Sequence, residues 1–351
     1  MFRWSVGVAL MAVSGAPAAA SERPLATAER SVAVMGTTLD LAVRMETRGE
    51  ALGAAERAVA EVRRIEDLLT TWRDSPLAAL NRAPVGVEVA LSPELTRVLA
   101  DVFAWTPRTD GAFDPTILPL VKAWDLRGSG RIPNASELDA GRRAMGARAF
   151  RIDTARGAAV RLDGNAGIDE GAWGKGYALE RALELLRKAG ATNAMLNLGG
   201  EVAAMGKDPE AKDWTVSLAH PRRRQQRVAV LALADSAIST SGNSERAREF
   251  GGRTIGHLLD PKTGEPAPDF GSVSVIAPSP FVADVLSTAF FVLGPRKGLS
   301  LSERLRGQGV PHETLYLIER GDGLEAAASP GIDAIVVSAD PAVHGLNPAH
   351  P

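Results

Sequence analysis

The sequence predicts an α+β fold in which long helices pack on antiparallel sheet. Two observations carry this prediction. Segments with apolar residues at helical spacing occur near the start, in the middle and near the end of the chain. Four short strand-like runs follow one another between residues 194 and 277. No long Pro-, Ser- or Gly-rich linker, charge block or internal repeat supports a division into two domains.

Composition excludes several classes of protein. The 351 residues include 40 Lys and Arg against 42 Asp and Glu, which leaves a formal net charge of −2. Near-neutral charge argues against a dedicated nucleic-acid binder, because contacts with phosphates need clustered, excess Lys and Arg. The chain has no Cys. This excludes disulfide scaffolds, thiolate zinc sites, iron–sulfur clusters, cysteine nucleophiles and a lipid-modified N-terminal cysteine.

Residues 1–20 have the pattern of a secretory signal peptide. A short positive segment, Met1–Arg3, precedes an apolar run over Val6–Val13, and small residues end the pattern at Ala18–Ala20. The apolar run is too short to span a bilayer, which takes about 20 residues, and no later segment has the length and composition of a membrane span. We therefore expect cleavage after Ala20 and a soluble periplasmic protein. A disordered N-terminus is the alternative.

The first half of the chain is predicted to contain a strand, two helices and a hairpin. Residues 38–45 alternate as in a half-buried strand, and residues 50–70 carry apolar side chains at helical spacing. Ser92 and Pro93 are typical of a helix start, with Ser at the cap and Pro in the first turn. Residues 148–163 show two short apolar runs around a turn, which indicates a hairpin.

The second half is predicted to be richer in strands. A helix over Lys175–Ala189 ends before Gly190, a residue type that is common after helix C-termini. A second helix is predicted over Phe281–Leu293. The Pro-rich end over residues 340–351 is expected to be a flexible tail. Strand-like apolar runs occupy residues 194–198, 214–218, 228–233, 273–277 and 314–319.

A glycine-rich stretch over residues 168–177 leads into the first of these helices. Glycine-rich backbone at a helix N-terminus can approach a phosphate closely and direct several N–H groups at it, and Lys175 adds a positive charge there. The order of residues matches neither a Walker A loop nor a Rossmann fingerprint. Taken alone, the stretch is equally typical of a turn that only starts a helix.

Asp284 and Thr288 are four residues apart in the helix predicted over Phe281–Leu293, so their oxygens lie on one face. A carboxylate and a hydroxyl together suit a hard cation such as Mg²⁺, which takes few protein oxygens and completes its coordination with water and phosphate. The alternative is a local role, in which Thr288 bonds back within the helix and Asp284 favours its first turn.

The segment His257–Gly264 is typical of a strand that ends in a tight turn. An apolar pair lies between His257 and Asp260, and Pro, Thr and Gly follow. A histidine beside a phosphate site can act as a general base. A histidine that is hydrogen-bonded at a strand edge is the alternative.

Three further segments are individually weak. Residues 240–243 form a polar turn after a predicted strand. Residues 197–201 put two glycines into a strand-like run, as at a bulge or a close approach by a ligand. The run Arg222–Arg224 lies between two predicted strands and indicates a solvated hairpin loop.

In this order the motifs resemble those of the ApbE-type FAD:protein FMN transferases. Eight collinear blocks carry the resemblance and cover most of the mature chain. The blocks are Met35-Gly36-Thr37, Thr71 to Asn81, Asp110 to Thr116, Asp169 to Tyr177, Asn197 to Glu201, Thr240-Ser241-Gly242, His257 to Gly264 and Ala283 to Ala289. One block could match by chance, whereas eight in order could not. The resemblance implies a single ApbE-like domain over residues 30–320, with antiparallel sheets packed against long helices.

The resemblance implies a Mg²⁺-dependent enzyme that moves the FMN half of FAD onto a Thr or Ser hydroxyl of a target flavoprotein and releases AMP. Acceptors of the family carry an Asp-x-x-[Ser/Thr]-Gly-Ala-Thr type motif. In such phosphoryl transfer, positioning and charge neutralisation dominate. By resemblance, the metal ligands are Asp284, Thr288 and the backbone carbonyl of Gly174, the base is His257 supported by Asp260, and the FAD site is lined by Met35, Trp72, Asp114, Lys175 and Thr240.

The chain departs from the family pattern at several positions. Trp72 stands where Tyr is usual, and Gly256 replaces the first His of a His-His pair. Ala172 and Trp173 replace Gly and Ile, which bears on the shape of the loop near the flavin. Family members are often lipoproteins, and a chain without Cys lacks the residue that carries the lipid.

Three other functions remain open at this point. An FAD pyrophosphatase would use the same residues, with water in place of the acceptor hydroxyl, and would release FMN and AMP. An exported flavin-binding protein without catalysis would have no need of Asp284, Thr288 and His257 together. A periplasmic solute-binding module would show a two-lobed α/β alternation, which this sequence lacks. The sequence does not name the acceptor protein.

Overall fold

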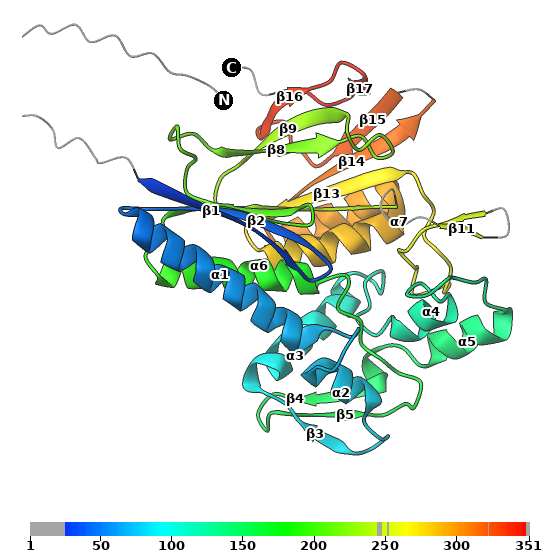
Figure 1. Cartoon of the computed structure of the whole chain (residues 1–351). Coiled ribbons are helices and arrows are strands. Elements are labelled where there is room, and N and C mark those ends of the chain that lie inside the picture. The colour runs from blue at the N-terminus through cyan, green and yellow to red at the C-terminus, as the bar shows by residue number, and fades with distance from the viewer. Residues whose placement is uncertain (1–24, 244–247, 251–252, 322, 349–351) are drawn as a thin grey trace, which may run out of the picture.

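The computed structural model describes residues 25–243, 248–250, 253–321 and 323–348. The predicted signal peptide, residues 1–20, lies outside the described residues. The described chain is a mixture of helices and antiparallel sheets, and its main feature is a sheet of nine strands (Figure 1). The α+β fold predicted from the sequence is confirmed.

The nine-stranded sheet has the order β1-β2-β6-β7-β10-β13-β14-β15-β17. Neighbouring strands are antiparallel, except that β15 and β17 are parallel. Four of the predicted strands lie in this sheet, as β2, β6, β13 and β14. Its members are β1 (Ala26–Val34), β2 (Thr37–Met45), β6 (Asn193–Leu198), β7 (Glu201–Met205), β10 (Ala237–Gly242), β13 (Gly271–Ala277), β14 (Glu313–Arg320), β15 (Gly323–Ala328) and β17 (Val343–His344).

Three long helices cover one face of this sheet (Figure 1): α1 (Arg48–Leu69), α6 (Gly174–Lys188) and α7 (Pro280–Gly307). Helix α1 begins with a capping box, in which the side chains of Thr47 and Glu50 each accept the other residue's backbone N–H. The apolar stripe of the helix, which includes Val62 and Ile65, is buried in the main hydrophobic core. The predicted helices over residues 50–70 and Lys175–Ala189 are therefore confirmed.

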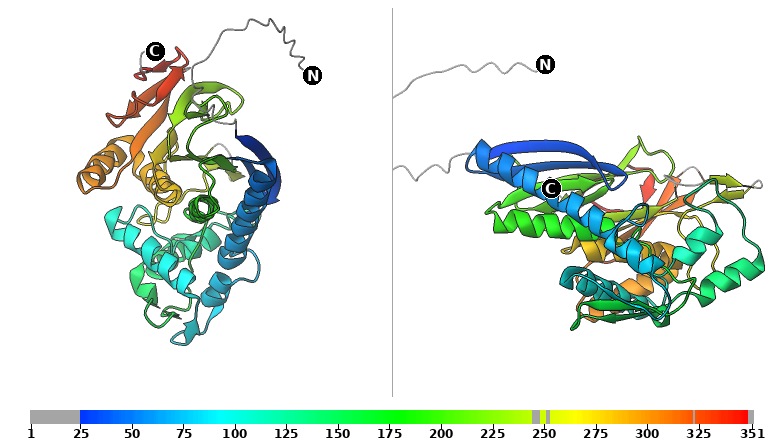
Figure 2. Two further views of the ribbon diagram at one scale, coloured as in Figure 1. Left: turned by 90° about the vertical axis from the view of Figure 1, so that its left-hand side faces the viewer. Right: turned by 60° about the horizontal axis from the view of Figure 1, so that its bottom comes forward.

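A smaller sheet covers the opposite face (Figures 1 and 2). It has the order β16-β9-β8 and consists of β16 (Val336–Ala339), β9 (Arg227–Leu233) and β8 (Trp214–Ala219). A second hydrophobic core, which includes Trp214, Leu231 and Leu315, lies between the two sheets. Because both faces of the large sheet are covered, its central strand β13 is buried at every position.

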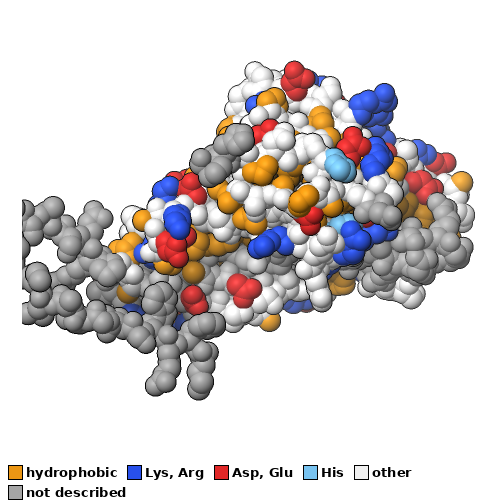
Figure 3. Space-filling model, turned by 90° about the horizontal axis from the view of Figure 1, so that it is seen from above, with side chains coloured by type: hydrophobic (Ala, Val, Ile, Leu, Met, Phe, Trp, Pro, Cys, Tyr) orange, Lys and Arg blue, Asp and Glu red, His pale blue; other side chains and the backbone are white. Residues whose placement is uncertain are grey.

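The surface above the smaller sheet carries acidic and basic side chains interspersed with hydrophobic ones (Figure 3). Among the described residues, no helix combines the length and the apolar character that crossing a membrane requires.

Shorter elements lie at one end of the long helices, in the lower part of Figure 1. The predicted helix start at Ser92 is confirmed, since its hydroxyl accepts the N–H of Leu95 at 3.1 Å. The predicted hairpin is β4 paired with β5. The elements are α2 (Pro76–Arg82), β3 (Glu88–Ala90), α3 (Pro93–Arg108), α4 (Leu118–Ala123), α5 (Ala135–Arg143), β4 (Phe150–Asp153) and β5 (Ala158–Arg161).

The helix predicted over Phe281–Leu293 is the first half of α7. Gly294 has a φ of 72°, outside the helical region, and Pro295 follows it, so α7 is broken there. A second helical stretch continues to the end of α7. Beside the break, the hydroxyl of Tyr316 on β14 donates to the carbonyl of Phe290 at 3.0 Å.

The end of the chain differs from the flexible tail predicted over residues 340–351. Strand β17 pairs with β15, and the side chains of Val343 and Leu346 are buried in the second core. The sequence pattern missed this packing because a two-residue strand has no periodicity to detect. Residues 349–351 lie outside the described residues.

Candidate active site

Helix α6 begins beside helix α7, and a carboxylate of α7 caps it. The residue before α6, Trp173, makes no side-chain hydrogen bond to the first turn. Instead, Oδ2 of Asp284 accepts the backbone N–H of Gly176 at 2.9 Å. The first N–H groups of a helix have no partners within the helix, and the helix dipole is positive there, so a carboxylate is favourable. Asp284 is only 3% exposed.

Gly176 makes this contact possible. A Cβ atom at this position would lie 2.5 Å from the carbonyl oxygen of Pro280 and 2.6 Å from Cβ of Asp284. The backbones of α6 and α7 approach so closely that a larger residue would force them apart. The glycine-rich stretch recognised in the sequence therefore serves helix packing as well as the opening of α6.

Lys175 and Glu201 place two further charges next to Asp284. Nζ of Lys175 forms an ion pair with Oε1 of Glu201, the first residue of β7. Burial raises the pKa of the Asp284 carboxyl, whereas the positive charge of Lys175 and the N–H of Gly176 oppose that shift. Two buried carboxylates thus share one ammonium group, and this local excess of negative charge suits a bound cation.

Ser287 ties this part of α7 to strand β10. Its Oγ lies 3.1 Å from Oγ of Ser239 and 3.0 Å from Oγ of Ser241. Alternate residues of a strand point to opposite faces, so Thr240 points away from α7. Its hydroxyl lies 2.8 Å from that of Ser274. The structure therefore does not bring Thr240 to the capped start of α6.

Two tight hairpin turns lie beside the start of α6. Met35 and Gly36 join β1 to β2 with φ of 51° and 69°, and Gly199 and Gly200 join β6 to β7 with φ of 62° and 94°. Positive φ at both central residues is typical of a type I′ turn. The N–H of Gly199 donates to a carbonyl of β2 at 3.0 Å. Cε of Met35 lies 3.8 Å from the position that a Cβ at Gly174 would take.

Trp72 is held by residues that lie far from it in the sequence. It is 67% exposed, and the guanidinium of Arg127 lies over its ring, 4.7 Å from the centroid. Arg127 also donates to the carbonyl of Thr71 at 3.0 Å and to the carboxylate of Asp169 at 2.5 Å. Glu170 accepts the N–H and the O–H of Thr71, at 3.1 and 2.5 Å. We call these five residues the Trp72 clamp.

The Trp72 clamp fixes an exposed aromatic ring with a cation against one face. Burial is the main cause that raises the pKa of Glu170, and the negative charge of Asp169 adds to it. Arg127 belongs to none of the motif blocks. It is separated by 56 and 42 residues from its partners Thr71 and Asp169, so a local sequence pattern could not have found it.

Asp114 lies next to the same loop. Its Oδ1 accepts the N–H and the O–H of Thr116, at 2.8 and 2.5 Å. Burial raises the pKa of this carboxyl, and the two hydrogen bonds from Thr116 oppose the shift. The carbonyl of the following residue, Pro115, accepts the N–H of Asp169 at 2.8 Å. The loop that carries Asp114 is thereby joined to the loop that leads into α6.

His257 lies on the segment after β12 (Arg253–Ile255) and is half-buried. Leu259 forms a single β-bridge with Pro266. Oδ1 of Asp260 accepts the N–H of Lys262 at 2.8 Å, which is an Asx turn. The predicted tight turn is confirmed, and the carboxylate of Asp260 stabilises it.

Most of the predicted site residues fall into three groups. Trp72 and Asp114 each adjoin a residue that is hydrogen-bonded to the loop before α6, and His257 and Asp260 lie on the segment after β12. Thr288 follows Asp284 by one turn of α7 and is partly exposed. Four residues meet where α6 begins: Met35, Gly174, Lys175 and Asp284.

Trp173, one of the departures from the family pattern, is a core residue. Its side chain is fully buried, and its Nε1 donates to the carbonyl of Asp169 at 2.8 Å. The indole therefore fixes the loop before α6 from within and presents none of its surface to solvent.

Comparisons with known proteins agree with this architecture. The model of the ApbE family matches residues 35–310. The FAD:protein FMN transferase of Escherichia coli K12 is 30% identical over 78% of this chain and 79% of its own length. The Haemophilus influenzae protein of that name is 29% identical, over 88% and 93%. The crystal structure of the ApbE protein from Thermotoga maritima has a TM-score of 0.80 at 26% identity, covering 88% of this chain and 99% of that one. Because the family model spans most of the sequence, the chain belongs to the ApbE family.

Proposed function

We propose that the protein is an FAD:protein FMN transferase, which attaches FMN from FAD to a Thr or Ser hydroxyl of a target flavoprotein and releases AMP. The observation that carries this proposal is the start of α6, where Lys175, the buried Asp284 and helix N–H groups come together. A pyrophosphate with an associated cation requires positive charge and N–H donors for its oxygens and a carboxylate for the cation, and the start of α6 provides these groups. Two relatives that bear this name match the chain over most of its length.

In the proposed reaction, the acceptor hydroxyl oxygen attacks the phosphorus atom of the FMN half of FAD. A bond forms between that oxygen and phosphorus, the bond from phosphorus to the bridging pyrophosphate oxygen breaks, and AMP leaves with the bridging oxygen. His257 takes the hydroxyl proton as general base. Asp260 supports it by fixing the turn that follows.

The residues at the start of α6 fit Mg²⁺. Oδ2 of Asp284 accepts the N–H of Gly176, so Oδ1 is the oxygen that would coordinate the cation. The hydroxyl of Thr288 and the carbonyl of Gly174 would complete a small set of hard oxygen ligands. The described residues contain no cluster of three His, Cys, Asp or Glu side chains that could hold a metal. When bound, the cation would neutralise charge on the phosphate oxygens.

The FAD contacts follow from the same arrangement. Lys175 would meet the pyrophosphate, and Met35 would contact FAD beside it from the β1–β2 turn. Trp72, fixed by the Trp72 clamp, would offer its ring to the flavin, and Asp114 would accept a hydrogen bond through the oxygen that Thr116 does not use. Thr240 stays a prediction, because its side chain points away from α7.

The proposed setting is the periplasm, reached through the signal peptide over residues 1–20, with the transferase domain over residues 30–320. The proposed partner is a flavoprotein with an Asp-x-x-[Ser/Thr]-Gly-Ala-Thr type motif. The sequence pattern and the family resemblance support this setting and this partner.

The direct test incubates the purified mature protein with FAD, Mg²⁺ and an unflavinylated protein that carries the acceptor motif. Mass spectrometry is expected to show the acceptor with one added FMN group, and chromatography an equal amount of AMP. An unmodified acceptor alongside accumulating FMN and AMP would indicate a pyrophosphatase instead. FAD that stays bound and intact would indicate a flavin-binding protein.

A further inference from the structure

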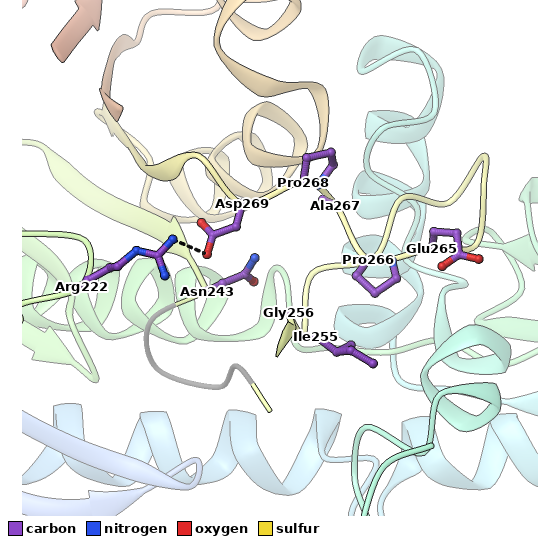
Figure 4. Close-up of a pocket in the computed structure, with 9 residues that line it drawn as sticks. All are labelled: Arg222, Asn243, Ile255, Gly256, Glu265, Pro266, Ala267, Pro268 and Asp269. Atoms are coloured by element: carbon purple, nitrogen blue, oxygen red, sulfur yellow. Dashed lines mark ion pairs between the residues drawn. The ribbon is translucent and has the colours of Figure 1, made fainter. Parts of the chain in front are cut away.

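A cavity of about 500 Å³ is lined by residues from several loops, one of which leads into His257 (Figure 4). Gly256, which directly precedes His257, forms part of its wall. The other walls come from the loop between β8 and β9, the residue after β10, and residues 265–269 before β13. Among the described residues that line it, none is a predicted FAD contact or metal ligand. The cavity therefore adjoins the residue before the proposed base, and the predicted flavin contacts do not line it.

Asn243 brings an unused hydrogen-bond acceptor to this cavity. Its side chain is 3% exposed, and its Oδ1 accepts no hydrogen bond from the described residues. A Cβ at Gly256 would lie 2.4 Å from Cγ, Nδ2 and Oδ1 of Asn243 alike, so the amide lies flat against the glycine backbone. A buried acceptor without a donor is unfavourable, and native proteins rarely keep one without a purpose.

Arg222 supplies a fixed cation to the part of the wall near Asn243 and Asp269 (Figure 4). Its Nε donates to Glu319 at 2.6 Å, and its guanidinium lies 3.7 Å from the carboxylate of Asp269. The side chain is still 61% exposed, so it remains open to a further ligand. Pro266 and Pro268 line the wall beyond Asp269 and contribute no N–H donors.

We propose that this cavity holds an extended segment of the acceptor protein next to the hydroxyl that receives FMN. Oδ1 of Asn243 accepts a backbone N–H of that segment, and Arg222 donates to one of its carbonyl or carboxylate oxygens. The proposal rests on the proposed transferase function, because that reaction needs a protein substrate beside His257. We assign a peptide and not the adenine end of FAD to this cavity, because the predicted FAD contacts lie elsewhere, whereas Gly256 of the cavity wall directly precedes His257.

The experiment compares the wild-type protein with Asn243→Leu and Arg222→Gln. Two constants are measured for each: the KM for the unflavinylated acceptor in the transfer assay, and the Kd for FAD by quenching of flavin fluorescence. We expect the KM for the acceptor to rise by about tenfold in Asn243→Leu, the effect of one lost buried hydrogen bond, and by a similar factor in Arg222→Gln, which loses a charge-assisted hydrogen bond. The Kd for FAD is expected to stay within about twofold.

Arg223→Gln is the matched control, because Arg223 is the next residue of the same loop, is exposed and does not line the cavity. It should leave both constants unchanged. If circular dichroism shows that Asn243→Leu does not fold, Arg222→Gln alone tests the proposal, because the side chain that it changes is exposed. A raised Kd for FAD with an unchanged KM for the acceptor would make this a nucleotide pocket and overturn the proposal, as would two unchanged constants. If the wild-type protein transfers no FMN, the transferase function itself fails, which is a separate result.

Discussion

At the residue scale, the two oxygens of Asp284 have different proposed roles, one as a helix cap and one as a metal ligand, and two substitutions can separate these roles. Asp284→Asn keeps an oxygen that can accept the N–H of Gly176 but removes the charge that a cation needs. We expect its Tm to stay near that of the wild type while Mg²⁺-dependent release of AMP is lost. Asp284→Ala should lose both, with a drop in stability of about 1 kcal/mol, as for a removed helix cap. Undiminished AMP release by Asp284→Asn would rule out its role as a metal ligand.

His257 is expected to affect the rate of transfer and not the binding of FAD. His257→Ala should slow FMN transfer by roughly 10²- to 10⁴-fold, the range typical of a lost acid–base group. Stopped-flow or steady-state transfer assays measure the rate, and fluorescence titration measures the Kd for FAD. His344→Ala, at an exposed position on β17, is the control and should behave as the wild type. Unchanged turnover of His257→Ala at neutral pH would remove His257 from the mechanism.

In the proposed site, Arg127 would act on FAD through Trp72 and is therefore a positioning residue. Arg127→Lys keeps the charge but loses the planar fork that reaches Thr71 and Asp169 together. We expect the Kd for FAD to rise by about tenfold, while the rate at saturating FAD stays close to that of the wild type. Arg73→Gln is the control, because Arg73 adjoins Trp72 but forms its ion pair with the exposed Asp67. A wild-type Kd for Arg127→Lys would show that the Trp72 clamp plays no part in binding.

At the element scale, the contact between α6 and α7 sets the geometry of the proposed metal site. Gly176→Ala would place a methyl group 2.5 Å from the carbonyl oxygen of Pro280. We expect a loss of about 1–3 kcal/mol in the free energy of unfolding, typical of overpacking, together with weaker dependence of the rate on Mg²⁺. Gly53→Ala in α1 is the control, since its nearest neighbour would be the flexible Arg57 side chain at 3.5 Å. That variant should be neutral or slightly more stable. A fully stable Gly176→Ala would contradict the tight contact.

Most elements could be predicted from the sequence because their periodicity is local. The helices α1, α3 and α6 carry an apolar stripe or a start signal within their own residues. The first half of α7 was predicted to end at Leu293, directly before Gly294 and Pro295, whereas the continuation of the helix to Gly307 was not predicted. Strand β17 could not be predicted, since its pairing with β15 depends on residues about 20 positions away in the chain.

The site was predictable only in part, because many of its contacts join residues that lie far apart in the sequence. Motif spacing identified Asp284 and Lys175, but not that Asp284 caps α6 across an interface between helices. The partner of Lys175, Glu201, lies 26 residues from it, and Ser287 meets its partners 46 and 48 residues away. Such pairs form only when the chain folds, so no short window of sequence contains both members.

At the scale of the whole molecule, the stability should fall in mild acid because of His312. This residue is 5% exposed, its Nε2 lies 2.9 Å from Oγ of Ser302, and burial lowers its pKa from the usual 6.5. As the pH falls below 6.5, His312 binds a proton in the unfolded chain but not yet in the native state. The free energy of unfolding is therefore expected to decrease from that pH downwards, until the lowered native pKa is reached.

Denaturant titrations at pH 7.5 and pH 5.5 check this expectation. His312→Asn should lose part of the decrease between the two pH values, because it removes the linked proton. His344→Asn, which changes an exposed histidine, should keep the full decrease. An equal decrease in the wild type and in His312→Asn would show that other groups account for the acid sensitivity.

The short strand β17 also has a consequence for how molecules of this protein meet one another. The edge of a sheet exposes N–H and C=O groups that can recruit a strand from a neighbouring molecule. By pairing with Leu324 and Glu325, β17 occupies part of the outer edge of β15, and Leu346 anchors it in the core. The sequence of this segment predicts a flexible Pro-rich tail. In the structure, its two-residue strand β17 covers part of the sheet edge and so disfavours pairing with another molecule.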